Sequence, residues 1–222
     1  METWSRTLLR WLLPAACPFC REDLAPGEDG PLCPACLDGL PAPPDAQPPS
    51  TGKACRFVRA AARHAGPAAA LVHALKFRGA RDGARQAGRA MARELARRPE
   101  LWGCDALVPV PAHPSRERRR GYDQALLIAR ELGVVARLPV LRLLERRRAG
   151  APAWTLGRVA RREQVRGAFG PAPWATGLAA GRRLLLIDDV CATGETLEDC
   201  ARALRRAGAR DAAGLVFARA GD

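Results

Sequence analysis

The sequence contains no stretch of about 18 or more uncharged apolar residues, so it offers no candidate for a membrane-spanning helix. It contains no GxxxxGK[ST] motif, which excludes the phosphate-binding loop of P-loop nucleotide hydrolases. The histidines His64, His73 and His113 are scattered, and they complete no metal-binding or catalytic-triad pattern. No internal repeat is present. These absences exclude membrane-spanning, P-loop and repeat proteins from the classes to consider.

Lysine is also scarce, since only Lys53 and Lys76 occur among 36 basic residues. The basic residues outnumber the 23 acidic ones, which gives a formal net charge of +13. Such an arginine-rich surface favours phosphate-bearing partners, either nucleic acid or a phosphorylated small molecule. A GC-rich genome would produce the same excess of arginine, so the charge alone does not choose between these explanations.

The N-terminal stretch "TLLRWLLPAAC" has some features of a secretory or lipoprotein signal that ends at Cys17. However, Arg10 interrupts the apolar run, Glu2 stands where positive charge is expected, and Pro14 replaces the aliphatic residue of a lipid-attachment site. We therefore expect a short amphipathic helix here and a cytoplasmic protein.

Four of the eight cysteines form two CxxC pairs, "CPFC" and "CPAC", with a twelve-residue insert between them: Cys17, Cys20, Cys33 and Cys36. Each turn points both sulfur atoms the same way, which suits tetrahedral zinc with Zn–S bonds of about 2.3 Å. So small a segment cannot bury a core of its own, and zinc would supply the missing folding energy.

A redox CxxC and a pair of disulfides are the alternatives for these cysteines. Redox motifs normally occur singly, and disulfides do not suit a reducing compartment, so we expect structural zinc. The other four cysteines show no pairing and are expected to be small buried or half-buried side chains: Cys55, Cys104, Cys191 and Cys200.

A proline-rich segment, "LPAPPDAQPPSTGK", covers residues 40–53 and is typical of a stiff, extended linker. It separates an N-terminal helix and zinc-ribbon-like module, residues 1–39, from a larger domain, residues 54–222. In that domain, predicted helices alternate with predicted strands. Helices are expected at 67–79, at 84–98, after Gly121 and at 195–206; strands are expected at 105–110, 138–144, 184–187 and 212–218. The alternation predicts an α/β fold with a Rossmann-like parallel sheet.

Two adjacent acids, Asp188 and Asp189, follow the strand in "LLLIDDVCATGET", which runs from Leu184 to Thr196. They are therefore expected at the sheet edge where α/β proteins bind ligands. Burying either carboxylate costs several kcal/mol unless something pairs with it. Ribose hydroxyls, a bound Mg²⁺ or positive charge developing on a sugar ring would each serve.

The turn after these acids opens a helix. Backbone N–H groups at a helix start, together with two threonine hydroxyls, form a cradle for phosphate, and a glycine lets the backbone approach closely. Acids that bind a diol beside a phosphate cradle describe a site for a ribose 5-phosphate. The cradle residues are Val190, Cys191, Ala192, Thr193, Gly194, Glu195 and Thr196.

The same motif resembles the phosphoribosyl pyrophosphate (PRPP) signature of type I phosphoribosyltransferases. Together with "CPFC…CPAC", "LKFRG", "VPVPAHPSRERRRGYDQA" and "RVARREQVRGAF", in this order, it makes nearly the whole chain similar to the ComF/GntX family. That family joins a zinc-ribbon-like N-terminus to a phosphoribosyltransferase domain and is linked with DNA uptake and natural competence. The resemblance implies a type I phosphoribosyltransferase fold, a pyrophosphate-side loop at 108–111 and a flexible hood at 148–169.

The resemblance also implies roles for individual residues. Asp188 and Asp189 would be the catalytic residues that hold the ribose 2′ and 3′ hydroxyls, and Mg²⁺ would accompany PRPP. Lys76, Arg119 and Arg120 are the further candidates for binding substrate. The basic segment that contains Arg119 and Arg120 is also consistent with a nucleic-acid contact or with a solvated loop, and Lys76 is also consistent with a helix-end charge.

Two functions remain open at this point. The first is a PRPP-dependent phosphoribosyltransferase, a glycosyltransferase, with a role in DNA uptake. The second is an inactive adaptor that keeps the fold and handles single-stranded DNA and DNA-uptake proteins. The sequence does not identify the acceptor, the partner or the oligomeric state.

Overall fold

The structure is a computed structural model that describes residues 16–25, 27–43, 54–147 and 167–220. The expected N-terminal helix, most of the proline-rich linker and residues 148–166 of the expected hood lie outside these ranges. Within them, no helix has both the length and the apolar character needed to cross a membrane.

A four-stranded sheet forms the centre of the larger domain, with the strand order β1-β6-β5-β2 and all neighbours parallel. The predicted parallel sheet is therefore confirmed. The strands are β1 (Val58–Arg63), β2 (Ala106–Pro109), β5 (Arg183–Cys191) and β6 (Asp211–Arg219). A separate antiparallel pair joins β3 (Leu144–Arg146) to β4 (Phe169–Pro171).

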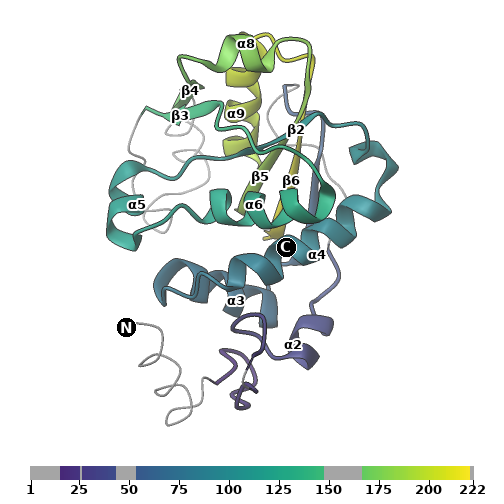
Figure 1. Cartoon of the computed structure of the whole chain (residues 1–222), viewed down its shortest axis with the longest axis vertical. Coiled ribbons are helices and arrows are strands. Elements are labelled where there is room, and N and C mark those ends of the chain that lie inside the picture. The colour runs from purple at the N-terminus through teal and green to yellow at the C-terminus, as the bar shows by residue number, and fades with distance from the viewer. Residues whose placement is uncertain (1–15, 26, 44–53, 148–166, 221–222) are drawn as a thin grey trace.

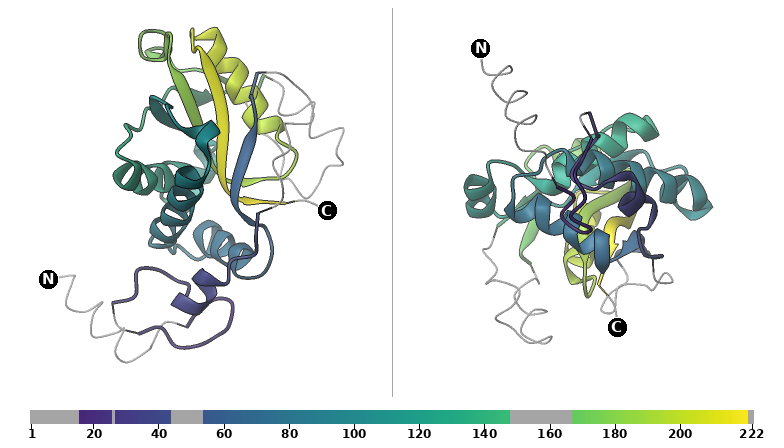
Figure 2. Two further views of the ribbon diagram at one scale, coloured as in Figure 1. Left: turned by 90° about the vertical axis from the view of Figure 1, so that its right-hand side faces the viewer. Right: turned by 90° about the horizontal axis from the view of Figure 1, so that it is seen from below.

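Helices cover both faces of the sheet, each with its own apolar core (Figure 2). One face carries α3 (Gly66–Phe77), α4 (Gly83–Arg97) and α6 (Gln124–Ala136). The other carries α9 (Glu195–Arg206), which is joined by β3, β4 and the short α8 (Ala175–Ala179). The remaining short helices are α2 (Pro34–Asp38), η1 (Pro99–Leu101) and α5 (Pro114–Arg120).

The helices α4 and α6 cross very closely at Gly88. A Cβ atom built there would lie 2.7 Å from Glu131 Cβ and 3.0 Å from Leu132 N. Real Cβ atoms do not tolerate such distances, so the missing side chain allows this close crossing.

The N-terminal module packs below α3 and α4 (Figure 1). Its buried residues Cys17 and Leu32 belong to the same apolar cluster as Leu71 of α3. The side chain of Gln86 on α4 holds the module by its backbone: Nε2 donates to Leu32 O at 2.7 Å, and Oε1 accepts from Leu32 N at 3.1 Å. Because Gln86 is 3% exposed, both bonds are shielded from water.

Two buried acids on α9 hold distant segments. Glu198 accepts from the N–H groups of Ala54 and Cys55, just after the linker, at 3.1 and 2.9 Å. Asp199 accepts from Gly167 and Phe169, at the start of β4, at 2.9 and 3.0 Å. The helix therefore fixes both segments to the body through charge-assisted hydrogen bonds.

Several sequence-based expectations need correction. The basic segment is not a loop but the helix α5, where His113 Nδ1 accepts from Ser115 N and Gly121 (φ 77°) ends the helix. Of the expected strand 138–144, only Val140, in a single bridge with Leu107, and Leu144, the first residue of β3, pair with another strand. The strand β5 continues to Cys191, four residues beyond the expected end.

Candidate functional site

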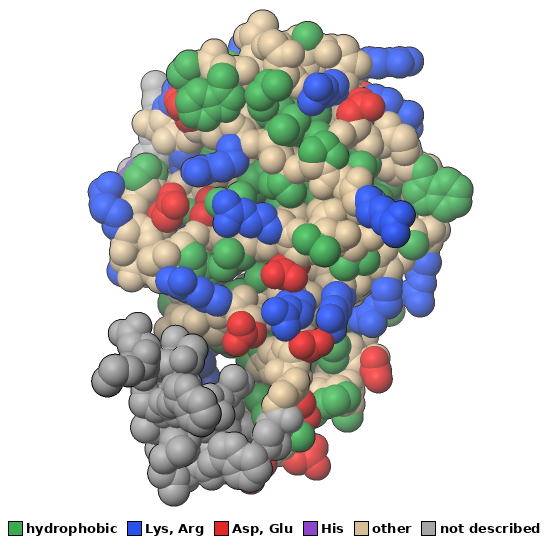
Figure 3. Space-filling model, in the orientation of Figure 1, with side chains coloured by type: hydrophobic (Ala, Val, Ile, Leu, Met, Phe, Trp, Pro, Cys, Tyr) green, Lys and Arg blue, Asp and Glu red, His purple; other side chains and the backbone are tan. Residues whose placement is uncertain are grey.

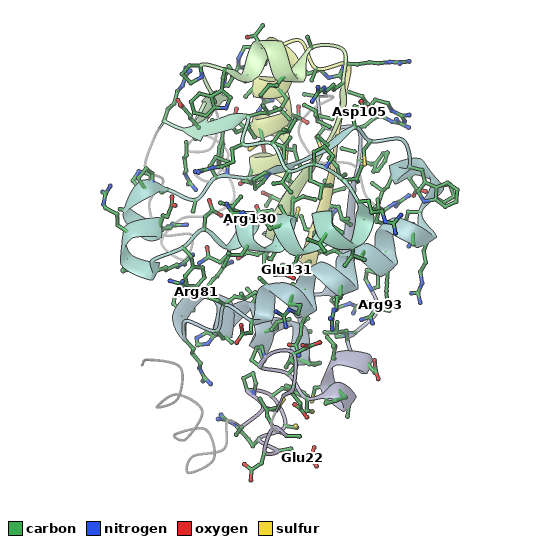
Figure 4. All side chains as sticks on the ribbon, viewed as in Figure 1. Glu22, Arg81, Arg93, Asp105, Arg130 and Glu131 are labelled. Atoms are coloured by element: carbon green, nitrogen blue, oxygen red, sulfur yellow. The ribbon has the colours of Figure 1, made fainter. Side chains whose placement is uncertain are left out.

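The acid pair lies at the carboxyl edge of the sheet, within the last part of β5 rather than beyond it. Asp188 is opposite Val216 of β6 in the parallel register. In Figure 4, the labelled Asp105 at the upper right precedes β2 and so marks the opposite, amino edge of the sheet. The labelled Arg81 at the lower left follows α3. Asp189 pairs with Lys76 of α3, whereas the charge of Asp188 acts on Arg146 of β3 and on Cys200 of α9, which belong to the opposite face of the sheet.

The two carboxylates are held in an electrostatically costly arrangement. Burial and the neighbouring charge of Asp189 raise the pKa of Asp188 well above its usual range. Two contacts oppose this: Lys76 Nζ lies 2.9 Å from Asp189 Oδ2, and the Asp189 N–H donates to Asp188 Oδ1 at 2.8 Å. Because burial is the main cause of this raised pKa, a ligand that brings a cation or hydroxyl donors to the carboxylates would offset the cost of ionising them.

The predicted phosphate cradle forms the turn between β5 and α9. Gly194 has φ 83° and is the N-cap residue, so the left-handed backbone turn needs glycine here. Thr193 and Thr196 are half-buried, and Ala192 is exposed. Cys191 points into the core instead, and burial raises the pKa of its thiol, so its side chain supports the turn from below.

A second group of polar side chains lies on the other side of the acids, at the junction of α5 and α6. Arg120 NH1 donates to Gln124 Oε1 at 2.8 Å, and the Arg120 guanidinium lies 5.6 Å from the centre of the Phe77 ring. Burial lowers the pKa of Arg120, while the charge of Asp189 acts in the opposite direction. Lys76 and Arg120, two of the candidate residues, therefore both lie near Asp189.

Asp123 fixes the geometry of this junction. One carboxylate oxygen caps α6 through Leu126 N at 3.1 Å, and the other accepts from Ala112 N at 2.9 Å, just after β2. Tyr122 donates to the carbonyl of Leu75 in α3. The segment after β2, the start of α6 and the end of α3 are thereby tied together around the acids. Within the expected pyrophosphate-side loop, 108–111, the first two residues belong to β2.

Two residues near the acids were not found by sequence reasoning. Arg146 of β3 is largely buried, which lowers its pKa, and the charge of Asp188 acts on it in the opposite direction. His64 follows β1, and burial and Lys76 lower its pKa while Asp189 opposes them. Neither stands in a motif, because each reaches the edge from a different strand. Because β1 pairs with β6 and β3 with β4, only the fold brings these two residues near the acids on β5.

Other candidate residues lie away from the acids or serve the fold. Arg119 is exposed on α5. His113 caps α5, as described above, and Trp174 donates to Arg142 O at 2.9 Å while remaining 57% exposed. Trp154 lies outside the described residues.

The four module cysteines converge as the CxxC spacing predicts. Their sulfur atoms all lie within 4.8 Å of one another, and Cys20 Sγ is 3.6 Å from Cys33 Sγ. A tetrahedron of sulfur atoms about 2.3 Å from zinc has edges of about 3.8 Å, so the residues fit that metal. Burial opposes ionisation of Cys17, but backbone N–H groups of Cys33, Cys20 and Phe19 lower its pKa to about 6. A thiolate is the form that binds zinc.

A small cavity of about 20 Å³ lies at the opposite, amino edge of the sheet, between Arg56, Trp102 and Arg183. This volume holds about one water molecule. The cavity therefore offers no competing ligand site.

Comparison with known proteins agrees with this geometry. A family model described as "Phosphoribosyl transferase domain" matches residues 119–221, which include the acid pair and the cradle. Competence protein F of Haemophilus influenzae is 32% identical over 120 residues, 54% of this chain and 52% of that protein. DNA utilization protein YhgH of Escherichia coli O157:H7 is 29% identical over 222 residues, 89% of this chain and 93% of that protein. The matched part thus spans about half of the first relative and nearly all of the second.

Among solved structures, the glutamine PRPP amidotransferase from B. subtilis, complexed with ADP and GMP, overlaps with 61% of this chain and 27% of its own. The TM-score is 0.40 and the sequence identity 21%.

Proposed function

Because the chain belongs to the ComF family and carries a phosphoribosyl transferase domain, we propose that it binds PRPP or a related ribose 5-phosphate at the carboxyl edge of its sheet. The fold is that of a type I phosphoribosyltransferase with a cysteine cluster at its N-terminus. One observation carries the proposal: the acid pair lies between the cradle at the start of α9 and the Lys76–Arg120 group. A ribose with an anionic group on either side matches this order of charges.

The chain's own residues would act by position and charge. Asp188 and Asp189 would accept hydrogen bonds from the ribose hydroxyls and stabilise positive charge on the ring, while the 191–196 turn holds the 5-phosphate. In a transfer, the bond from ribose C1 to the diphosphate oxygen breaks, and pyrophosphate leaves with the electron pair. The acceptor then bonds to C1 and loses its proton. The acceptor stays open.

Two metals belong to this proposal. Zinc would be held by the four module cysteines, where it would supply folding energy. Mg²⁺ would arrive with the diphosphate, since carboxylate oxygens are its preferred protein ligands.

Isothermal titration of PRPP with Mg²⁺ into zinc-loaded protein tests the proposal. We expect micromolar binding by the wild type and none by the Asp188→Asn, Asp189→Asn double variant. Glu131→Gln, which changes an acid on α6 away from the site, is the control and should bind normally (Figure 4). A folded wild type that binds neither PRPP nor ribose 5-phosphate would disprove the proposal.

Nucleic-acid handling is the second candidate function, and the names Competence protein F and DNA utilization protein YhgH support it. Its physical support is a row of four exposed arginines along α4, each about 6 Å further along the helix axis (Figure 3). The row comprises Arg85, Arg89, Arg93 and Arg97, of which the first two also pair with Asp29 of the module. Phosphate contacts of this kind are released by salt.

Binding of a single-stranded oligonucleotide at increasing salt tests this candidate. We expect affinity to fall steeply with salt in the wild type, and with a shallower slope in Arg93→Gln, Arg97→Gln protein. Neutralising the α5 arginines, Arg116, Arg118 and Arg119, tests the other basic segment in the same assay. An affinity that does not depend on salt would contradict the candidate.

A further inference from the structure

The junction of α5 and α6 contains two buried hydrogen-bond donors without an acceptor. Among the described side chains, the buried N and O atoms that lack a partner are Arg120 Nε, Gln124 Nε2 and one carboxylate oxygen of Glu28 in the module. Gln124 is only 4% exposed. A buried donor left unpaired destabilises the fold, so two of them at one junction require an explanation.

The two donors form one unit. Arg120 NH1 donates to Gln124 Oε1, which fixes the amide so that its NH₂ group faces away from that bond. If the amide were flipped, its NH₂ would face the guanidinium donors, so this orientation is the favourable one. The ring of Phe77 lies over the guanidinium and limits its movement. The arginine and the amide therefore keep their unpaired donors in place without a ligand.

This unit borders the acid pair. The charge of Asp189 acts on Arg120, and Lys76, which contacts Asp189 at 2.9 Å, precedes Phe77. Asp123, the neighbour of Gln124, acts electrostatically on Asp188. The cradle at the start of α9 lies on the other side of β5, because α9 and α6 cover opposite faces of the sheet. A ligand that spans the acids would reach the cradle with one end and the donors with the other.

The chemistry of the unit selects an anion rich in oxygen. Two N–H donors, one from a guanidinium and one from an amide, match two oxygens of a phosphate group, and Lys76 adds a positive charge beside them. A ribose monophosphate held in the cradle has only hydroxyl groups to offer on this side. A diphosphate on C1 supplies the acceptors that both donors lack.

We propose that Gln124 and Arg120 form the part of the site that recognises the diphosphate group and so distinguishes PRPP from ribose 5-phosphate. The inference rests on the proposed function for the identity of the sugar, but the donors themselves require only a diphosphate. Gln124 acts here as a specificity-determining residue, and Arg120 both contacts the ligand and orients the amide.

Titration of three probes into zinc-loaded protein tests this assignment: PRPP with Mg²⁺, pyrophosphate with Mg²⁺, and ribose 5-phosphate. In Gln124→Leu we expect PRPP and pyrophosphate to bind at least about tenfold more weakly, and ribose 5-phosphate to change by less than about twofold. Gln124→Glu keeps the acceptor for Arg120 and replaces the donor by a negative charge. It should lose pyrophosphate binding most strongly, and it carries the test if Gln124→Leu fails to fold.

Arg120→Gln should show the same selectivity, and Arg130→Gln, an exposed arginine on α6, is its charge-matched control (Figure 4). Equal losses for PRPP and ribose 5-phosphate, or no loss for PRPP, would overturn the assignment while leaving the proposed function intact. If the wild type binds neither PRPP nor ribose 5-phosphate, the proposed function is wrong, but the assignment is judged by pyrophosphate. Pyrophosphate binding that Gln124→Glu abolishes would still support the assignment. A wild type that does not bind pyrophosphate would overturn the assignment.

Discussion

The cysteine cluster and the acid pair each bring together side chains of the same kind, but they differ in where their surrounding residues come from in the chain. The cluster takes all four sulfur atoms from residues 17–36 and brings them within 4.8 Å of one another. The acid pair comes from one strand, but its partners come from α3, β3 and the α5–α6 junction. A local cluster with four ligands leaves no position open, which is typical of structural zinc, whereas the acids keep oxygens available at an open edge.

The largest effect should come from breaking the cluster. Cys33→Ser removes one of four ligands, and we expect the protein to lose zinc and several kcal/mol of stability, because metal binding supplies folding energy and Cys33 belongs to the core below α4. Zinc content and the thermal midpoint measure this. A strong chelator should reproduce the effect in the wild type, and an unchanged midpoint after complete zinc removal would refute the structural role.

The next largest effect should come from separating the module from the body. Gln86→Leu leaves the buried N–H and C=O of Leu32 without partners, which should cost about 2–4 kcal/mol. Urea denaturation measures the loss, and the rate of zinc release to a chelator should rise with it. If stability falls but zinc release does not change, the two regions are not coupled through this contact.

At the acid pair, we expect a substitution to raise the free energy of unfolding rather than lower it. Asp188→Asn removes a carboxyl whose pKa is raised in the folded state, so it should stabilise the protein by about 1 kcal/mol near neutral pH while it abolishes PRPP binding. The wild type bears no cost below the unfolded-state pKa of about 4, because the carboxyl is then protonated in both states. The cost grows as the pH rises and is complete above the folded-state pKa. Denaturation from acidic to neutral pH measures this, and a variant less stable than wild type at neutral pH would contradict it.

The smallest effect should come from the ion pairs at the rim of the module. Arg89→Gln removes one of two arginines that pair with Asp29, a contact that is about half exposed to water. Surface pairs of this kind contribute little, so its thermal midpoint should match that of the wild type. The same variant serves as the control for Gln86→Leu, since both positions lie on the module-facing part of α4.

The elements with strong local signals were predictable from the sequence. The helix 195–206 was predicted with its observed bounds, because its cradle turn and amphipathic pattern are local. The strand β1 was missed because "VRAAAR" has one β-branched residue and much alanine, and it becomes a strand through its pairing with β6. The helix α5 was taken for a loop since "PSRERRR" has no apolar face, and its caps, His113 and Gly121, determine it instead.

The candidate site divides in the same way. The acids, the cradle and the cysteines stand in contiguous motifs, and sequence reasoning found them. The importance of Gln86, Glu198 and Asp199 depends on partners that lie up to 144 positions away in the chain, and a single amide or carboxylate in a helix carries no signal of such a contact. Gln124 pairs with Arg120 only four positions away, but its burial comes from the fold. Only the fold reveals which polar side chains are buried.

The close crossing at Gly88 has a consequence for how this protein can vary. A random library at position 88 should return glycine almost alone, since even the methyl group of alanine would push α6 away from α4. Gln86 on α4 holds the cysteine module, and Gln124 begins α6 at the junction with α5, so a side chain at position 88 that pushed the helices apart would disturb both contacts. The hydrogen atom of Gly88 thus lets one close helix crossing connect the cysteine module with the edge that carries the acid pair.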